Sequence, residues 1–395
     1  MPHYNYLIVG GGMTADAAIR GIREIDTQGT VGLIGAETHP PYNRPPLSKA
    51  LWKGKPIERI WRKTLERNVS LHLGRTANTL DLAARRVDDD LGTAYTFDKL
   101  LLATGGTPRR FPFGGDDILY YRTLDDYQRL RALTQDKQRF AVIGGGFIGS
   151  EIAAALAMNG KEVVMVFPEP GIGARLFPEE LSLFLNDHYR QQGVEVLPGQ
   201  QVTDLQRADA HLVLTIRDGK TTNERTISVD AAVAGIGIVP NTQLAEFAGL
   251  PVENGIVVNE LLQAGSSDVY ASGDVANFYN PALDKRLRVE HEDNANSMGK
   301  RAGLNMAGET DPYHHLPFFY SDLFELGYEA VGETDSRLET IGDWSEPYQK
   351  GVVYYLQNGR VRGALLWNVW ERVDAARELI AQPGPIEPQS LKGRL

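Results

Sequence analysis

Two short glycine-rich segments carry the clearest chemistry in this sequence. One has the spacing Gly-x-Gly-x-x-Ala and the other the complete spacing Gly-x-Gly-x-x-Gly. In such a motif the first glycine permits a tight turn, the second lets a pyrophosphate approach the backbone, and the third small residue lets a helix pack on a strand. One copy alone is a weak signal, but two copies predict two dinucleotide sites. The predicted contacts are Gly10, Gly11, Gly12, Met13, Thr14 and Ala15 in the first site, and Gly144, Gly146, Phe147, Ile148 and Gly149 in the second.

Three carboxylates stand where a nucleotide could meet them. Glu37 ends the second strand of the first unit and could accept hydrogen bonds from a ribose, and Glu169 holds the equivalent place in the second unit. A carboxylate there favours NAD over NADP, although Arg175 nearby could pair with a phosphate. Asp274 follows a strand and Gly273, and suits a sugar-chain hydroxyl. The alternatives are a solvated loop carboxylate for Glu169 and a helix N-cap for Asp274.

Each glycine motif needs a strand before it and a helix after it, and the sequence supplies both. We expect a strand at 4–9, a helix at 13–24 and a strand at 30–34, and then a strand at 139–143, a helix at 147–158 and a strand at 162–167. Small-residue turns at 103–106 and 234–240 indicate points where the chain passes from one domain to another. The sequence thus predicts an α/β fold with two Rossmann-like domains, the second inserted in the first.

The last 80 or so residues differ in pattern from the rest. Short strands are expected at 328–332, 351–356 and 360–367, with an Asn358-Gly359 hairpin turn, followed by a helix at 369–381. We therefore predict a C-terminal α+β domain. The expected divisions are 1–112 (first segment of the first dinucleotide-binding domain), 113–238 (second dinucleotide-binding domain), 239–312 (second segment of the first domain) and 313–395 (C-terminal domain).

Composition excludes several functional classes. The chain has 395 residues, a net charge of −10 and no cysteine. A nucleic-acid partner is therefore not expected, because such binding relies on many basic contacts to phosphate. Disulfides, cysteine-ligated metals and a redox-active dithiol are excluded. His314 and His315 have no partners at metal spacing, so no metal site is expected. With no leader-like start and no apolar run long enough to span a membrane, a cytoplasmic location is expected.

Longer motifs add a family resemblance. The segments PYNRPPLSKALW, GGGFIGSE, FPEPGIGARLFPEEL, RVEHEDNANSMGKRAGLNMAGE, SDLFELGYEAVGE and LLWNVWERVDAAREL are similar to apoptosis-inducing factor and its bacterial relatives. The NADH-dependent ferredoxin and rubredoxin reductases are also similar, and all resemble the wider pyridine nucleotide-disulfide reductase group. The resemblance covers nearly the whole chain. One departure is Ala174, which replaces a family glycine beside Arg175.

The resemblance implies two cofactors, FAD and NAD(H), and a set of residues for each. It implies FAD contacts from Gly10 to Thr14 and at Glu37, Arg44, Lys49, Ala77, Arg109, Asp274, His291 and Trp367, with Thr104, Gly105 and Glu292 beside them. It implies NADH contacts at Gly146, Phe147, Glu169, Arg175, Gly237 and Glu290.

The resemblance also implies a catalytic pair, in which Lys49 lies at flavin N5 and is held by Glu151. The alternative for Lys49 is an exposed surface lysine, but the flanking prolines and the partner argue against it. Phe147 is expected to form an aromatic wall, or else to fill the core at the start of a helix. A core histidine remains open for His291. Trp367 could cover the flavin or fill the C-terminal core.

With no cysteine, electrons must leave from the flavin itself to an external acceptor. The interpretation is an FAD-containing NADH oxidoreductase that reduces a ferredoxin, a rubredoxin, a quinone-like compound or oxygen. Eight basic residues in 44–67 could dock an acidic ferredoxin or rubredoxin, or form a solvated face. A homodimer also stays open. The alternatives are a redox sensor that holds NAD in a long-lived complex, and a nucleotide-binding scaffold without activity.

Overall fold

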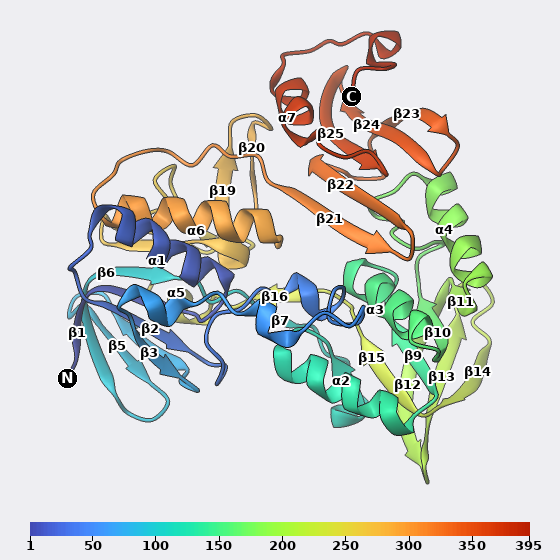
Figure 1. Ribbon diagram of the computed structural model, residues 1–395, viewed down its shortest axis with the longest axis horizontal. Helices are drawn as coiled ribbons and strands as arrows, with labels where there is room; N and C mark the ends of the chain where they lie inside the picture. The colour runs from blue at the N-terminus through green and yellow to red at the C-terminus, as the bar shows by residue number, and fades with distance from the viewer. The chain divides into compact units, whose positions relative to one another are not determined.

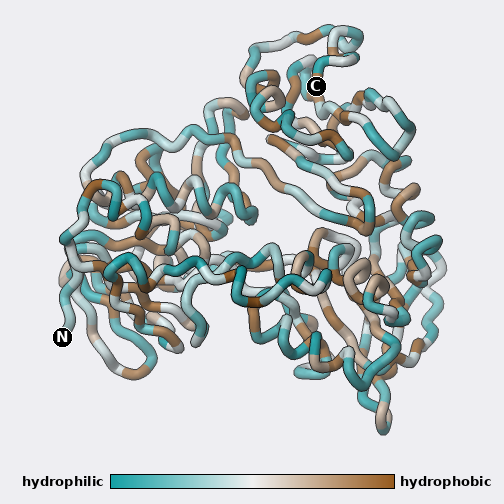
Figure 2. The backbone as a smooth tube through the Cα atoms, in the orientation of Figure 1, coloured by the Kyte–Doolittle hydropathy of each residue, from teal (hydrophilic) through white to brown (hydrophobic).

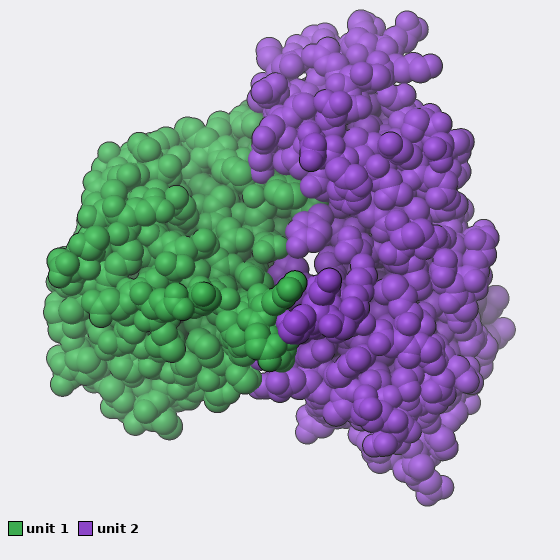
Figure 3. Space-filling view, in the orientation of Figure 1, with its two compact units in different colours: residues 1–44, 57–107, 239–319 green, residues 45–56, 108–238, 320–395 purple.

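The computed structural model describes all 395 residues, and they form two compact units. Figure 3 colours them separately: unit 1 is Met1–Arg44, Ile57–Thr107 and Val239–Phe319, and unit 2 is Pro45–Pro56, Pro108–Ile238 and Tyr320–Leu395. Each unit is therefore assembled from three separate stretches of chain.

Unit 1 is built on a seven-stranded sheet. Its strand order is β3-β2-β1-β6-β5-β4, and β18 also pairs with β6. Strand β1 runs parallel to both neighbours, with Leu7 opposite Gly32 on one side and Leu100 on the other. The bounds are β1 (His3–Val9), β2 (Val31–Gly35), β3 (Ser70–Leu73), β4 (Ala77–Asp81), β5 (Arg86–Asp89), β6 (Ala94–Leu102) and β18 (Val269–Ala271).

Two helices of unit 1, α1 (Met13–Ile25) and α6 (Glu292–Met306), lie side by side (Figure 1). Glycines make this close packing possible, because a Cβ at Gly303 would lie 2.0 Å from the carbonyl oxygen of Ala18. The helices therefore hold the first and last stretches of the unit together. The unit also contains α5 (Gln243–Phe247) and a small sheet of β17 (Ile256–Val257), β19 (Ala276–Asn280) and β20 (Lys285–Leu287).

Unit 2 contains a second, five-stranded parallel sheet, and its order is β11-β10-β9-β15-β8. Its apolar strands appear as brown stretches of backbone in Figure 2, and Phe140, Ala141 and Val166 are fully buried. The bounds are β8 (Ile118–Tyr120), α2 (Leu124–Asp136), β9 (Arg139–Ile143), α3 (Phe147–Met158), β10 (Glu162–Phe167), α4 (Glu179–Gln191), β11 (Val194–Pro198) and β15 (Ala231–Ala234). An antiparallel sheet is formed by β12 (Gln200–Ala208), β13 (His211–Asp218) and β14 (Glu224–Val229).

The C-terminal region is an antiparallel sheet with the order β21-β22-β25-β24-β23 and one helix, α7. Its hairpin turn has positive φ at both central residues, 53° at Asn358 and 72° at Gly359, as a two-residue turn of this kind requires. The bounds are β21 (Phe318–Leu323), β22 (Leu326–Gly332), β23 (Glu339–Glu346), β24 (Lys350–Gln357), β25 (Arg360–Trp367) and α7 (Val373–Ala381).

The remaining elements are short. Strands β7 (Gly106–Pro108) and β16 (Ile238–Pro240) pair with each other, and the 3-10 turns are η1 (Pro45–Leu47), η2 (Ile57–Ile60), η3 (Thr64–Arg67), η4 (Gly115–Asp117), η5 (Gly273–Val275) and η6 (Pro388–Leu391). The longest helices are too short or too polar to cross a bilayer.

The expected fold class is confirmed, with two dinucleotide-type α/β sheets and a C-terminal α+β region. Strand β9, helix α3 and strand β10 have the predicted bounds. The final helix begins later than expected, at Val373 and not at residue 369. Asn368 and Glu371 both adopt positive φ, 50° and 62°, which a helix cannot accommodate.

Candidate active site

The first glycine turn in unit 1 has the geometry of a phosphate cradle. Gly10 has φ of 119°, and a Cβ there would lie 2.0 Å from the carbonyl oxygen of Ala103. A Cβ at Gly12 would meet no atom within 4 Å, and no side chain caps the start of α1. The open space and the uncapped N–H groups fit the pyrophosphate of a dinucleotide. Met13, Thr14 and Ala15 form the first turn of α1 and are buried.

Glu37 follows β2 and is held by two neighbours in unit 1. Its carboxylate accepts a 2.6 Å hydrogen bond from the Tyr42 hydroxyl and forms an ion pair with Arg44. The Arg44 guanidinium also lies over the Tyr42 ring, 5.1 Å from its centroid. Burial acts against the charge on Arg44, but the nearby Tyr42, Glu37 and Asp274 together raise its pKa. The structure thus brings Glu37, Arg44 and Asp274 into one electrostatic group.

Asp274 lies in η5, directly after β18, beside the first turn of α1. Gly273 has φ of 79°, and a Cβ there would lie 2.3 Å from the Thr14 hydroxyl oxygen. Only a glycine allows this approach of backbone to α1. The carbonyl oxygen of Asp274 accepts a 3.0 Å hydrogen bond from Arg288, which also pairs with Glu290 at 2.6 Å. The expected FAD residue Asp274 and the expected NADH residue Glu290 therefore share one arginine.

His291 is the N-cap residue of α6, and Glu292 is the first residue of that helix. The His291 ring stacks on Phe319 with centroids 4.2 Å apart and planes 18° apart. The residue is only partly buried, which disfavours the alternative of a core histidine. An uncapped start of α6 leaves N–H groups that could stabilise negative charge.

Of the other predicted FAD residues, Thr104 lies beside the first glycine turn, because a Cβ on Gly10 would lie 3.1 Å from the Thr104 nitrogen. Ala77 begins β4, and the Thr104 hydroxyl donates a 2.7 Å hydrogen bond to the carbonyl oxygen of Asn241, just before Gly105. Arg109 belongs to unit 2, where its N–H donates to the carbonyl oxygen of Gly237 at 2.9 Å.

The second glycine turn, in unit 2, repeats the geometry of the first. Gly144 has φ of 114°, and a Cβ on Gly149 would lie 2.0 Å from the Gly144 carbonyl oxygen. Gly146 again has open space, with no atom within 4 Å of an added Cβ. Phe147 and Ile148 are 37% and 36% exposed, which disfavours a core role for Phe147. The turn therefore fits a second dinucleotide, with two apolar side chains beside it.

Glu169 and Arg175 form an ion pair beside this turn. The Arg175 Nη2 atom lies 2.7 Å from Glu169 Oε1, and the arginine side chain is 88% exposed. Arg175 therefore pairs with the carboxylate that would repel the 2′-phosphate of NADP. Gly237 has φ of 89°, and a Cβ added there would lie 3.8 Å from the Nε atom of Arg109.

Lys49 and Glu151 meet inside unit 2 although 102 residues separate them. The Lys49 Nζ atom donates to Glu151 Oε1 at 2.5 Å, and their side chains are 12% and 4% exposed. The Lys49 ammonium also lies 5.3 Å from the centroid of the Tyr320 ring. This geometry rules out the alternative of an exposed surface lysine. A nearly buried cation with its own counter-ion can act on a bound ligand without solvent screening.

Two serines complete the contacts of Glu151, and sequence reasoning missed both. Ser48 donates to Glu151 Oε2 at 2.5 Å, and Ser321 donates to Oε1 at 2.6 Å. Ser48 could have been suspected because it precedes Lys49. Ser321 carries no such signal, since it lies 170 residues from Glu151 and serine is common in any strand.

Trp367 is a core residue of the C-terminal sheet. It is fully buried, stacks on Tyr328 with planes 7° apart, and donates from Nε1 to the carbonyl oxygen of Tyr348 at 2.8 Å. A side chain with no exposed surface cannot cover a ligand, so the core-filling alternative is favoured over a flavin contact.

Most charges of the basic segment 44–67 are already paired. Arg44 pairs with Glu37, Lys49 with Glu151, and Lys53 lies 3.7 Å from Asp322. Asp16, which is 1% exposed, receives both Arg62 at 2.8 Å and Arg67 at 3.7 Å. Lys63 lies 3.9 Å from Glu66, and both of these side chains are well exposed. Lys55 and Arg59 are also exposed.

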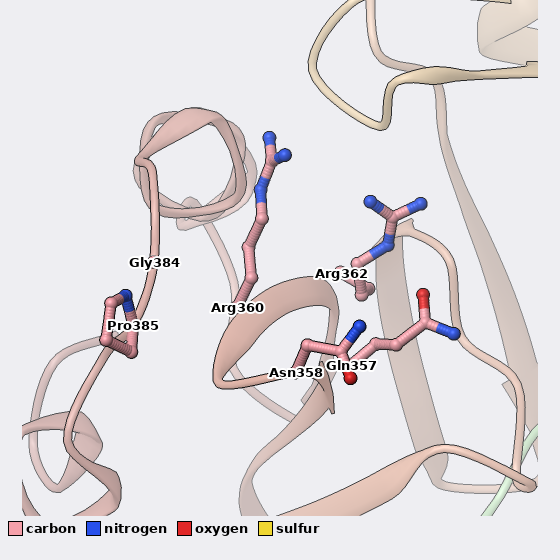
Figure 4. A pocket seen from close by; sticks show the side chains of 6 residues that line it. All are labelled: Gln357, Asn358, Arg360, Arg362, Gly384 and Pro385. Carbon is pink, nitrogen blue, oxygen red and sulfur yellow. The ribbon is translucent and has the colours of Figure 1, made fainter.

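A separate pocket of about 350 Å³ lies at the β24–β25 turn (Figure 4). It is lined by Gln357, Asn358, Arg360, Arg362, Gly384 and Pro385. Arg362 is paired with Glu333 at 3.1 Å. None of the predicted site residues lines this pocket, so it leaves the assignment unchanged.

Comparison with known proteins identifies the family. Residues 4–299 match the profile "Pyridine nucleotide-disulphide oxidoreductase", and 302–347 and 343–382 match "Apoptosis-inducing factor, mitochondrion-associated, C-term". The chain is 36% identical to mitochondrial apoptosis-inducing factor 1 of Dictyostelium discoideum, covering 97% of this chain and 79% of that protein. It is 31% identical to putidaredoxin reductase CamA of Pseudomonas putida, covering 98% and 94%.

Solved structures agree. The reductase in a covalent putidaredoxin reductase–putidaredoxin complex matches with a TM-score of 0.90 at 29% identity, covering 99% of this chain and 96% of that one. A ferredoxin reductase from Rhodopseudomonas palustris matches with a TM-score of 0.88 at 28% identity, covering 98% and 96%. The chain therefore belongs to the pyridine nucleotide-disulphide oxidoreductase family, as an FAD- and NAD(H)-dependent oxidoreductase with the C-terminal domain of apoptosis-inducing factor.

Proposed function

We propose that this protein oxidises NADH and passes the electrons through FAD to a ferredoxin-type iron–sulfur protein. The observation that carries the proposal is the buried Lys49–Glu151 pair in a chain with no cysteine. Without a thiol the protein has no dithiol relay, so the flavin must deliver electrons directly. The relatives support the acceptor, since one of them is named as the ferredoxin–NAD(+) reductase component of an anthranilate 1,2-dioxygenase system and is 32% identical.

Bound FAD supplies the acceptance of a hydride and the release of electrons to an acceptor. The protein residues supply position and field. The Lys49 ammonium, fixed by Glu151, places a positive charge where we propose that flavin N5 lies. The uncapped starts of α1 and α3 receive the phosphate groups of the two dinucleotides, and Glu169 selects a free 2′-hydroxyl on the NADH ribose.

Stopped-flow spectroscopy tests the proposal. NADH should reduce the FAD-loaded protein within seconds of mixing. A small ferredoxin should then reoxidise it rapidly. Reoxidation by ferredoxin no faster than by air would contradict the proposed acceptor. Protein that binds no FAD and is colourless would contradict the enzymatic role itself and favour a scaffold.

A redox sensor is the second candidate, and the 36% identity to an apoptosis-inducing factor favours it. In this role, reduced protein keeps NAD bound and reoxidises slowly. A long-wavelength absorption band that persists in air after one equivalent of NADH would support sensing. Rapid loss of the band on addition of ferredoxin would exclude it.

A cytoplasmic location and a homodimer also belong to the proposal. Cell fractionation with an antibody tests the first, and light scattering at several protein concentrations tests the second. A mass of about 44 kDa at all concentrations would contradict the dimer.

A further inference from the structure

The carboxylate of Glu151 accepts hydrogen bonds from three donors, which come from two other stretches of unit 2. Lys49 and Ser48 come from the segment Pro45–Pro56, and Ser321 comes from β21 at the beginning of the C-terminal sheet. The three donor–oxygen distances lie between 2.5 and 2.6 Å. Ser321, the donor from β21, has no exposed surface and is more deeply buried than Ser48 or Lys49.

Hydrogen bonds to an ionised carboxylate stabilise its charged form. In a buried position this matters more, since water cannot replace a missing donor. Lys49 and Ser321 both donate to Oε1, so Ser321 acts on the same oxygen that holds the lysine. A hydroxyl there stabilises the charge of Glu151 and fixes the direction of the carboxylate.

The titratable groups that face Glu151 are Lys49 and three buried tyrosines. Burial, with a smaller contribution from the Glu151 charge, raises the pKa of Tyr121, Tyr189 and Tyr328 well above the ordinary value. All three therefore stay neutral at physiological pH. Lys49 is the cation that donates to the carboxylate, and the hydroxyls of Ser48 and Ser321 supply the two other hydrogen bonds to it.

Ser321 is linked in turn to the core of the C-terminal sheet. A hydrogen bond between Tyr328 and Ser321 opposes the effect of burial on the pKa of that tyrosine. The Tyr328 ring stacks on Trp367, with centroids 5.6 Å apart. The Ser321 hydroxyl is thus held in place by the packed aromatic core, not by a mobile loop.

We propose that Ser321 is a positioning residue of the redox centre, which holds the Glu151 carboxylate in the direction of Lys49 and so makes the C-terminal domain a component of that centre. The proposal rests on the proposed role of Lys49 beside the flavin. Ser321 acts through Glu151 and does not touch the cofactor.

The test is the acid titration of Glu151 in Ser321→Ala. The protein is labelled with ¹³C at the glutamate carboxyl carbon, and the Glu151 signal is assigned by its absence in Glu151→Gln. Loss of one hydrogen bond to a charged group should move the midpoint of this signal to higher pH by about one unit, in both the apo and FAD-loaded forms. Ser321→Cys, which offers only a weak donor, should move it in the same direction.

Ser150→Ala is the matched control, because Ser150 is 4% exposed, adjoins Glu151 in sequence, and donates only to helix carbonyls. It should leave the midpoint unchanged. An unchanged midpoint in both Ser321 variants, or an equal change in Ser150→Ala, would overturn the proposal.

A kinetic measurement separates this inference from the function on which it rests. In Ser321→Ala the acid limb of the rate of flavin reduction by NADH should move by the same amount as the carboxyl signal, with KM for NADH unchanged. If the carboxyl signal moves and the acid limb does not, the inference fails. If wild-type protein is not reduced by NADH at all, the proposed function fails, while the carboxyl titration still decides whether Ser321 holds Glu151.

Discussion

At the scale of single residues, the two ion pairs of unit 2 differ in their surroundings. Lys49–Glu151 is almost fully buried, whereas Glu169–Arg175 joins a carboxylate to a side chain that is 88% exposed. Water therefore screens the first pair only weakly, whereas the second pair is largely screened and can be exchanged for a ligand at little cost.

Lys49→Met should slow the reduction of FAD by NADH at least about tenfold, which corresponds to about 1.4 kcal/mol of lost stabilisation. The reason is the loss of the positive charge that Glu151 holds in the centre. Rapid-mixing absorbance at 450 nm or so gives the rate. Lys53→Met is the control, since Lys53 lies in the same segment but is 46% exposed; equal slowing in both variants would contradict the role of Lys49.

Glu169→Ala should weaken NADH binding far more than FAD binding. It should also improve the use of NADPH, because Arg175 loses its partner and can pair with a 2′-phosphate. Dissociation constants for the three dinucleotides, measured by calorimetry, check this. Equal losses for FAD and NADH would show that the two glycine turns have been assigned to the wrong cofactors.

At the scale of elements, each glycine turn contains one glycine required by the backbone and one beside open space. Gly144 has a positive φ, and a Cβ there would lie 2.5 Å from the carbonyl oxygen of Gly235, whereas a Cβ at Gly146 would meet no atom within 4 Å. The same division holds for Gly10 and Gly12 in unit 1. Fold and binding can therefore be separated by substitution.

Gly144→Ala should destabilise the protein by at least about 1–3 kcal/mol, because the strained φ and the contact cannot both be relieved. Gly146→Ala should leave the unfolding midpoint of the apoprotein unchanged and weaken NADH binding. Chemical denaturation and NADH titration of both variants give the comparison. A destabilised Gly146→Ala would show that this position is not open.

Strand β22 contains a carboxyl group that is costly to ionise. Burial raises the pKa of Glu329, so the folded protein binds a proton more readily than the unfolded chain. Stability should then be lost as pH rises through the folded pKa, and Glu329→Gln should recover it. The variant should match the wild type at pH 4 and exceed it in stability at pH 8, as measured by urea unfolding. A difference that does not depend on pH would point to packing instead of charge.

At the scale of the whole molecule, docking of a partner depends on the charges that internal pairs leave exposed. In the basic segment Lys55 and Arg59 are exposed, and Lys63 is exposed although it lies 3.9 Å from Glu66. The net charge of −10 makes a local positive surface necessary for an acidic partner to approach.

Arg59→Glu combined with Lys63→Glu should raise KM for an acidic ferredoxin about tenfold at low salt, with little effect at high salt. Reduction of FAD by NADH should be unaffected, because neither side chain belongs to the predicted cofactor sites. Lys220→Glu combined with Arg225→Glu, at two exposed positions, is the control for a change of charge alone, because it also changes the net charge by four units. If the control variant raises KM equally, the ferredoxin docks elsewhere or responds only to net charge, which would contradict docking on the basic segment.

The sequence was most informative where the signal is local. Strand β9, helix α3 and strand β10 could be placed to the residue because the glycine motif, the apolar runs and the turn all lie within 30 or so residues. The Lys49–Glu151 pair required the family resemblance, since no periodicity links residues so far apart. Ser321 and the internal pairs of Arg62 and Arg67 could not be predicted, because tertiary packing alone decides which hydroxyls and cations are buried.

The division of the chain has a consequence for its synthesis. The sheet that starts with β1 receives β18 only after most of the chain has been made, and α1 obtains its partner α6 later still. Unit 1 ends at Phe319, so it cannot be completed on the ribosome until at least that residue has emerged. During that interval the apolar surface of α1 and β6 stays uncovered, and slow translation or a missing chaperone would favour aggregation at that stage. The rate of translation and the order in which the elements leave the ribosome are therefore expected to limit the yield of folded protein.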